Sequence, residues 1–263
     1  DSLNVLSYNS NLTIPKEDIS EVETTQDNPS VVPKTTDEQK DTSQSKDDGK
    51  NNKAESSDKK TEEKSEDKKV KSTGKRVYIY DTHQDESYKG GKTVLDAAAI
   101  LAQKLEDRGI KVVLETNDFI RYRDTHGLTY NESYVVSYKY LNEALVNYGG
   151  FDMCLDLHRD SIPREASYIN IDGKNYAKGM FVVGGLGKNA KTATKLSTTL
   201  TDTINAKKNG IMKGVMTREA YYNQEVAKNI VLMELGGDVN TFEEVSNSLD
   251  VIADGIHDVL TKE

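Results

Sequence analysis

Apolar residues along most of the chain fall into two alternating patterns. Short runs rich in Val, Ile, Leu and aromatic residues predict β-strands, and stretches with an apolar residue at every third or fourth position predict amphipathic helices. The predicted strands are 76–81, 110–114, the run that ends at His158, 179–183 and 230–235. The predicted helices are one between a Thr93 cap and Gly109, and those over 135–146, 189–207 and 242–260. This alternation predicts an α/β fold: a single open, largely parallel sheet with helices on both faces.

The first part of the chain lacks both patterns. Residues 1–74 contain no Arg and no Phe, and runs such as 46–53 mix charges without an apolar face. Such a segment cannot bury enough apolar surface to offset the entropy lost on ordering. We therefore expect a disordered, mixed-charge tether over 1–74 and one folded domain over 75–263. A long polar tether suits a membrane anchor upstream of Asp1, and we expect such an anchor.

Charge and cysteine content narrow the class of protein. The formal net charge is −9, so the sequence indicates no basic surface for nucleic acid. Cys154 is the only cysteine and lies within a predicted strand, which predicts a buried thiol and excludes a disulfide within the chain.

Acids and histidines follow three of the predicted strands. His83 and Glu86 come after the first strand with the spacing H-x-x-E, His158 ends another, and Glu234 lies in the strand before Gly236-Gly237. Ligands collect at the carboxyl ends of strands in open α/β sheets. Zinc hydrolases hold the metal with three protein ligands and use a nearby carboxylate to move protons.

This arrangement predicts a zinc-dependent amide hydrolase. His83, Glu86 and His158 are the predicted zinc ligands, and Glu234 is the predicted general base and acid. Three further acids are candidates for orienting the two imidazoles, namely Asp81, Asp156 and Asp160.

Several motifs in this order resemble those of a known family. They are the stretch 79–88 (IYDTHQDESY), 156–160 (DLHRD), 222–224 (YNQ), and 233–237 (MELGG) followed by Asn240-Thr241 and Glu243-Glu244. Over residues 76–263 the chain resembles the stage II sporulation protein P family, a divergent branch of the zinc-dependent N-acetylmuramoyl-L-alanine amidases. That family commonly has His-Thr-His where this chain has Asp81-Thr82-His83, which implies that His83 is the ligand here.

The resemblance implies a substrate, a place and partners. It implies cleavage of peptidoglycan between muramic acid and L-alanine, and an endopeptidase activity on peptide cross-links. It also implies anchoring in the mother-cell membrane, facing the septal space during engulfment, and action together with sporulation proteins D and M. By position, the zinc ligands fall on His83, Glu86 and His158 and the catalytic carboxylate on Glu234. Asp96 is the alternative to Glu86, because the ligand glutamate of the broader amidases lies further along the chain. Three residues are expected to line the substrate groove, namely Arg159, Asn223 and Gln224.

Two other functions fit the same residues. A zinc carboxypeptidase has the same order of parts, and it needs an arginine to hold the terminal carboxylate, for which Arg121, Arg123 and Arg164 are candidates. An inactive wall-binding or scaffolding module on an amidase fold is the other alternative. Released amino acids would indicate the first, and wall binding without turnover the second.

Overall fold

A computed structural model of the chain describes residues 70–262. The predicted tether over 1–74 lies almost entirely outside these residues. In chain order the elements are β1 (Arg76–Tyr80), α1 (Val94–Glu106), β2 (Lys111–Leu114), α2 (Phe119–Thr125), the 3₁₀ turn η2 (Tyr130–Glu132), α3 (Ser133–Tyr148), β3 (Met153–Asp160), α4 (Arg164–Ser167), β4 (Tyr168–Ile171), β5 (Lys174–Ala177), β6 (Gly179–Gly184), α5 (Ala190–Lys207), β7 (Met212–Arg218), β8 (Ile230–Gly237) and α6 (Phe242–Thr261).

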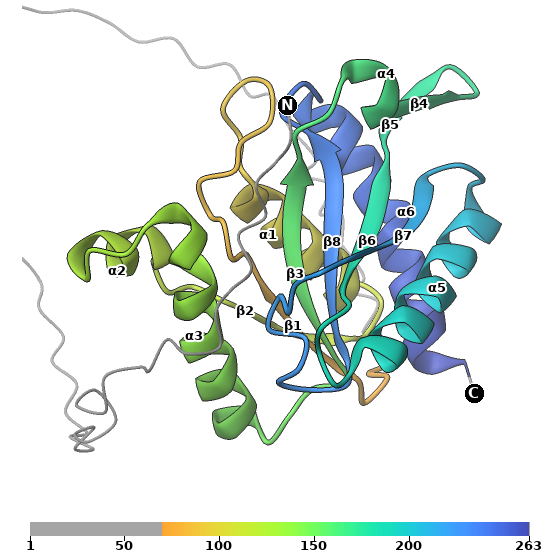
Figure 1. The fold of residues 1–263 in the computed structure, drawn as a ribbon. Helices are drawn as coiled ribbons and strands as arrows, with labels where there is room; N and C mark the ends of the chain where they lie inside the picture. Colours follow the sequence, from red (N-terminus) through yellow and green to blue (C-terminus); the bar gives the residue numbers. More distant parts are fainter. Residues whose placement is uncertain (1–69, 263) are drawn as a thin grey trace, which may run out of the picture. The chain divides into compact units, whose positions relative to one another are not determined.

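Six strands form one open sheet in the order β2-β1-β3-β8-β6-β7 (Figure 1). Strands β2, β1, β3 and β8 are parallel to their neighbours in this order. Strand β6 pairs with β8 antiparallel and with β7 parallel, so two strands run against the other four. The carboxyl ends of β1, β3 and β8 therefore meet at one edge of the sheet, where ligand sites form in folds of this kind.

Helices cover the two faces of the sheet unequally (Figure 1). The larger core contains apolar residues of α1, α5 and α6 packed on one face, with Val77, Leu155 and Met233 from the strands. The smaller core lies on the other face under α3, where Tyr78 and Cys154 pack with Leu141. Strand residues alternate between the two cores, as the two-residue period of a pleated strand requires.

The predicted fold class is confirmed, and the predicted strands and helices agree with the structure within a few residues. The buried position of Cys154 is confirmed as well. The sequence patterns did not predict α2, the short turns η2 and α4, the β4–β5 hairpin or strand β7. Within residues 70–262 no helix is long and apolar enough to span a membrane.

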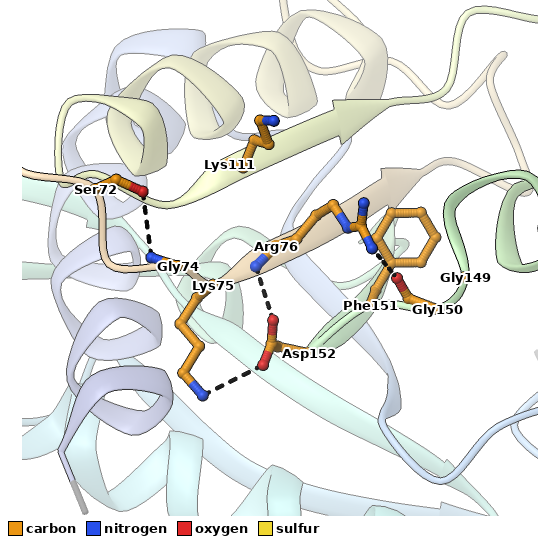
Figure 2. A pocket seen from close by; sticks show the side chains of 9 residues that line it. All are labelled: Ser72, Gly74, Lys75, Arg76, Lys111, Gly149, Gly150, Phe151 and Asp152. Carbon is orange, nitrogen blue, oxygen red and sulfur yellow. Dashed lines mark hydrogen bonds and ion pairs between the residues drawn. The ribbon is translucent and has the colours of Figure 1, made fainter.

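Charged side chains connect β1 and β3 at the amino end of the sheet (Figure 2). Asp152 accepts hydrogen bonds from the Arg76 backbone N–H (2.8 Å) and from the Lys75 ammonium (3.3 Å). The Arg76 guanidinium donates to the carbonyl oxygens of Tyr148 (2.6 Å) and Gly150 (2.9 Å). These contacts line a hollow of about 590 Å³ and bind the turn after α3 to β1, which fixes where β3 begins.

Candidate metal site and adjoining cleft

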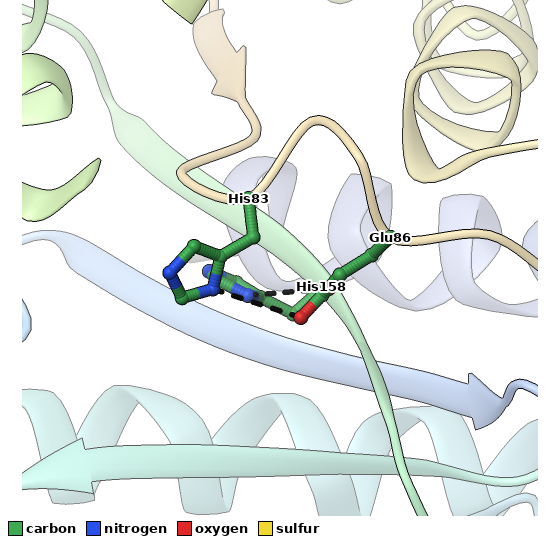
Figure 3. Close-up of side chains that lie close together, drawn as sticks. All are labelled: His83, Glu86 and His158. Atoms are coloured by element: carbon green, nitrogen blue, oxygen red, sulfur yellow. Dashed lines mark ion pairs between the residues drawn. The ribbon is translucent and has the colours of Figure 1, made fainter. Parts of the chain in front are cut away.

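Three side chains converge at the carboxyl end of the sheet (Figure 3). His83 and Glu86 come from the loop after β1, and His158 comes from β3. One ligand atom from each lies within 4.8 Å of the others. Glu86 Oε1 lies 3.6 Å from His83 Nδ1, and Glu86 Oε2 lies 3.4 Å from His158 Nδ1. The structure thus brings together the three residues that were predicted as ligands.

Local contacts shape the loop that carries His83 and Glu86. The backbone N–H of Glu86 donates to the His83 carbonyl (3.0 Å), and the Val94 N–H donates to the Glu86 carbonyl (3.0 Å). The first contact closes a tight turn, and the second ties that turn to the start of α1. Both side chains can therefore point to the same side of the loop, as H-x-x-E spacing in a turn allows.

Asp156 lies at ion-pair distance from His158. The two residues lie on the same side of β3, and Asp156 Oδ1 lies 3.0 Å from His158 Nε2. Thr82 holds the carboxylate through its N–H (2.9 Å) and its hydroxyl (2.6 Å). Nε2 of His158 faces this carboxylate, so Nδ1 faces Glu86 and the metal site. In many metal sites a carboxylate next to one ring nitrogen of a ligand histidine sets its tautomer in this way. The prediction that Asp156 orients an imidazole agrees with this geometry.

Glu86 is buried among donors. Burial alone raises the pKa of its carboxyl group, but the positive charge and hydrogen bond of His158, with donors on His83 and the Arg159 backbone, hold the pKa well below its usual value. The Arg159 N–H lies 2.9 Å from Oε2, and the Tyr130 hydroxyl lies 3.3 Å from Oε1. The group is thus kept as a carboxylate, which is the form that binds a metal.

Aromatic rings enclose His83. The Tyr130 ring stacks on the imidazole at 4.1 Å between centroids, and the Tyr134 ring meets its edge at 5.4 Å. Tyr130 lies in η2 and is 45% exposed, so it forms the outer cover of the site. No sequence pattern indicated a site role for either tyrosine; both lie between the predicted strand 110–114 and the predicted helix 135–146.

Glu234 lies beside this cluster on the adjacent strand. It is the register partner of His158 in the β3–β8 pair, so both side chains lie on the same face of the sheet. Within residues 70–262, its buried Oε2 has no hydrogen-bond partner. Burial raises the pKa of Glu234 to about 7, against the lowering effect of His158 and with a further increase from Glu86 and Asp160. A carboxyl group with such a pKa can both accept and donate a proton near neutral pH.

The other two acids predicted to orient the imidazoles, Asp81 and Asp160, make no hydrogen bond to either imidazole within residues 70–262. Asp160 pairs with Lys213 at 3.4 Å. Asp81 is 1% exposed, and its oxygens accept no hydrogen bond within residues 70–262. Burial, with the nearby Asp156 charge, raises the pKa of Asp81 well above its usual value. Asp96, the alternative to Glu86, caps α1 and binds Lys92 (2.7 Å) and the Thr93 N–H (2.9 Å) instead.

The three residues predicted to line the groove have structural contacts. The Arg159 side chain donates to the Ser87 carbonyl (3.0 Å). Asn223 is 2% exposed and donates to Tyr134 O (2.9 Å), and Gln224 is 1% exposed and donates to Val182 O (2.8 Å). Their binding of substrate stays a prediction.

A cleft of about 820 Å³ adjoins Glu234 on the face of the sheet that α3 covers only in part. Met180 and Val182 of β6 and Met216 of β7 line it, together with Arg218 and Tyr222. No sequence pattern indicated this cleft, because strand β7 was not predicted.

The donor set fits a zinc ion. Two imidazole nitrogens and one carboxylate oxygen are the ligands of many catalytic zinc sites. Tetrahedral zinc with bonds of about 2.0–2.1 Å places neighbouring ligand atoms roughly 3.4 Å apart. Each imidazole lies at about this spacing from one of the two Glu86 oxygens, His83 Nδ1 at 3.6 Å from Oε1 and His158 Nδ1 at 3.4 Å from Oε2, and one ligand atom of each residue lies within 4.8 Å of the others. The residues could therefore hold the metal with small side-chain shifts.

Solved structures with a similar arrangement include two bacterial amidases. The N-acetylmuramoyl-L-alanine amidase AmiC2 of Nostoc punctiforme matches with a TM-score of 0.47 and 15% identity, over 73% of this chain and 99% of that one. The CwlD amidase of Clostridioides difficile, solved with the GerS lipoprotein, matches with a TM-score of 0.49 and 16% identity, over 70% of this chain and 94% of that one.

Sequence comparison identifies the family. The stage II sporulation protein P of Bacillus subtilis (strain 168) is 31% identical over 207 residues, which cover 72% of this chain and 50% of that protein. The chain thus spans about half the length of this curated relative. The family model of stage II sporulation protein P (SpoIIP) matches residues 4–257. The chain belongs to the stage II sporulation protein P family.

Proposed function

We propose that the folded part of the chain is a zinc-dependent peptidoglycan amidase that cleaves the bond between N-acetylmuramic acid and L-alanine. The observation that carries this proposal is the convergence of His83, Glu86 and His158, with Glu234 beside them on the adjacent strand. The family resemblance supports the choice of a wall substrate.

In this proposal each residue has a separate task. A zinc ion held by His83, Glu86 and His158 would supply Lewis acidity to the scissile carbonyl. Glu234 would take a proton from the attacking water and transfer it to the leaving amine. Asp156 would keep His158 in the tautomer that presents Nδ1 to the site.

Mass spectrometry of muropeptides tests the proposal. Purified muropeptides are incubated with the zinc-loaded chain and, in parallel, with the His83→Ala variant. We expect free peptides that begin at L-alanine, and we expect none with the variant. The Glu243→Gln variant, which changes an exposed acid of α6, is the matched control and should act like the wild type.

The same assay separates the other functions. Intact muropeptides in all samples, with the chain bound to wall material, would indicate a binding module in place of an enzyme. Release of free terminal amino acids would indicate a carboxypeptidase. Two of the arginines considered for such an enzyme are already paired, Arg123 with Asp85 and Arg164 with Glu244, which favours the amidase. Cleaved peptide cross-links would show an additional endopeptidase activity.

We also infer that the protein acts outside the cytoplasm during engulfment, anchored to the mother-cell membrane and together with sporulation proteins D and M. This inference is supported by the family resemblance alone. Co-purification of each protein with this chain from sporulating cells tests the partnership, and failure to recover either one would contradict it.

A further inference from the structure

The cleft beside Glu234 has an apolar floor. Across the sheet, Glu234 of β8 is the register partner of Met180, and Val182 is the partner of Met216. Met180, Val182 and Met216 lie on the face opposite α5 and form an apolar strip between Glu234 at one end and Arg218 at the other. Such a floor favours the aliphatic parts of a peptide over a strongly hydrated sugar.

The wall of the cleft is held in place by strained backbone. Tyr222 and Asn223 both have left-handed conformations, with φ of 53° and 55°. Asn223 is buried and donates to Tyr134 O (2.9 Å) and Ser137 Oγ (3.0 Å) of α3, so these contacts keep the two residues in this conformation. Tyr222, which lines the cleft, lies 5.7 Å from the Tyr134 ring and so connects the cleft with the candidate metal site.

One charge in the cleft is uncompensated. Lys213 pairs with Asp160 at 3.4 Å, near the end of β3. The Arg218 guanidinium is exposed at the other end of the cleft and makes no hydrogen bond or ion pair with any residue of 70–262. An exposed guanidinium without a partner among these residues can bind a carboxylate of a ligand. This cation is notable in a chain with a formal net charge of −9.

The sheet register gives the length of ligand that would reach Arg218. Met180 faces Glu234, and Arg218 faces Gly184, four residues further along β6. With about 3.3 Å per residue along a strand and about 4.8 Å between strands, the Cα atoms of Glu234 and Arg218 lie roughly 16 Å apart. Part of this span is covered by the arginine side chain. An extended peptide then needs a carboxylate about two to three residues beyond the bond cleaved beside Glu234.

We propose that this cleft binds the peptide portion of the substrate in extended form, and that Arg218 selects peptides with a carboxylate two to three residues after the scissile bond. The position of the scissile bond rests on the proposed function. Arg218 is a specificity-determining residue in this proposal, and it takes no part in the chemistry.

Binding of short peptides to the zinc-loaded chain tests the proposal. The probes are Ala-Ala-Glu-Ala and Ala-Ala-Gln-Ala, both with an amidated C-terminus, measured by titration calorimetry. We expect the glutamate peptide to bind about five- to tenfold more tightly at low salt, and the preference to shrink at high salt. The Arg218→Gln variant should lose the preference, and Arg218→Lys should keep part of it. Lys228→Gln, an exposed lysine outside the cleft lining, should keep all of it.

The outcomes separate this inference from the proposed function. In turnover of muropeptides, Arg218→Gln should raise KM several-fold with kcat within about twofold of the wild type. An active enzyme with no preference between the peptides, or a preference that survives in Arg218→Gln, would overturn the role of Arg218 and leave the amidase standing. A chain that hydrolyses nothing, yet binds the glutamate peptide through Arg218, would overturn the proposed function and leave the cleft as a peptide site.

Discussion

The Asp156 carboxylate lies 3.0 Å from Nε2 of His158, two residues further along the same buried strand. Its position is set by Thr82, which precedes His83, through two hydrogen bonds. One carboxylate therefore links the strand that carries one histidine with the loop that carries the other. A substitution at Asp156 should therefore affect the metal site through the strand that carries His158 and through the loop that carries His83.

The first prediction concerns metal affinity. Asp156→Asn removes the charge that orients His158 and keeps an acceptor for Thr82, so zinc affinity should fall by about 10–100-fold. Competition with a chelating dye measures this directly. Asp202→Asn, an exposed acid on α5, is the control and should not change the affinity. Equal affinities for wild type and Asp156→Asn would show that Asp156 does not support the site.

The second prediction separates chemistry from metal binding. Glu234→Gln keeps the size of the side chain and removes its ability to move a proton. We expect bound zinc to be unchanged and the rate on muropeptides to fall by about 10²–10⁴-fold. Metal analysis of the purified variant, together with initial rates, checks both parts. Normal turnover by this variant would remove Glu234 from the proposed mechanism.

The third prediction concerns the outer cover of the site. Tyr130 contributes a stacked ring to His83 and a hydroxyl to Glu86. Tyr130→Phe loses only the weak hydroxyl contact and should bind zinc within about threefold of the wild type. Tyr130→Ala also loses the stacked pair, which is worth about 0.5–1.5 kcal/mol, and should bind up to about tenfold more weakly. Tyr148→Ala removes an equally exposed ring at the opposite end of the sheet, and it should leave zinc binding unchanged. The same affinity in Tyr130→Phe and Tyr130→Ala would contradict the role of stacking.

The fourth prediction concerns stability and pH. Burial alone raises the pKa of Glu244, but hydrogen bonds from Arg164, Asn240 and Thr241 hold it below its usual value. A lowered pKa stabilises the folded state above the unfolded pKa of about 4.3, and this contribution is lost as the pH falls through the folded pKa. Arg164→Gln should therefore reduce the free energy of unfolding by about 1 kcal/mol at pH 7, since the arginine is partly exposed.

Urea denaturation at several pH values tests this prediction. The difference between the wild type and Arg164→Gln should be largest near pH 7 and should shrink below about pH 4, where Glu244 takes up a proton. Arg121→Gln, at an exposed position on α2, serves as the reference variant. A difference that stays constant down to pH 3 would mean that Arg164 acts through packing alone.

The metal-ligand cluster could be predicted from the sequence because its signals are local. Each histidine follows or ends a clear apolar run, and parallel strands bring such positions to one edge of the sheet. The sequence also held a local signal for choosing Glu86 over Asp96, because Asp96 lies three residues after Thr93 in a capping box. In the structure Asp96 caps the start of α1.

The rest of the site depends on contacts between distant parts of the chain. Strand β7 has a glycine and a lysine near its start, so its pattern is too weak to predict a strand. The reversed direction of β6 and β7 has no local signal at all. Asn223 and Gln224 are polar residues in a loop, which suggests a surface position. They are buried because their amide groups bond backbone groups of other elements: Asn223 donates to a carbonyl of α3, and Gln224 both accepts from an N–H and donates to a carbonyl of β6.

The reversal of strand direction between β8 and β6 divides the sheet into two parts with separate tasks. The candidate ligands come from β3 and the loop after β1. The cleft is lined mainly by β6 and β7, with Glu234 of β8 and Asp160 at the end of β3 at its border. Residues 179–218 could therefore diverge, or be exchanged between relatives, without moving the ligands. Under the proposed function, the choice of substrate could then evolve while the metal ligands stay in place.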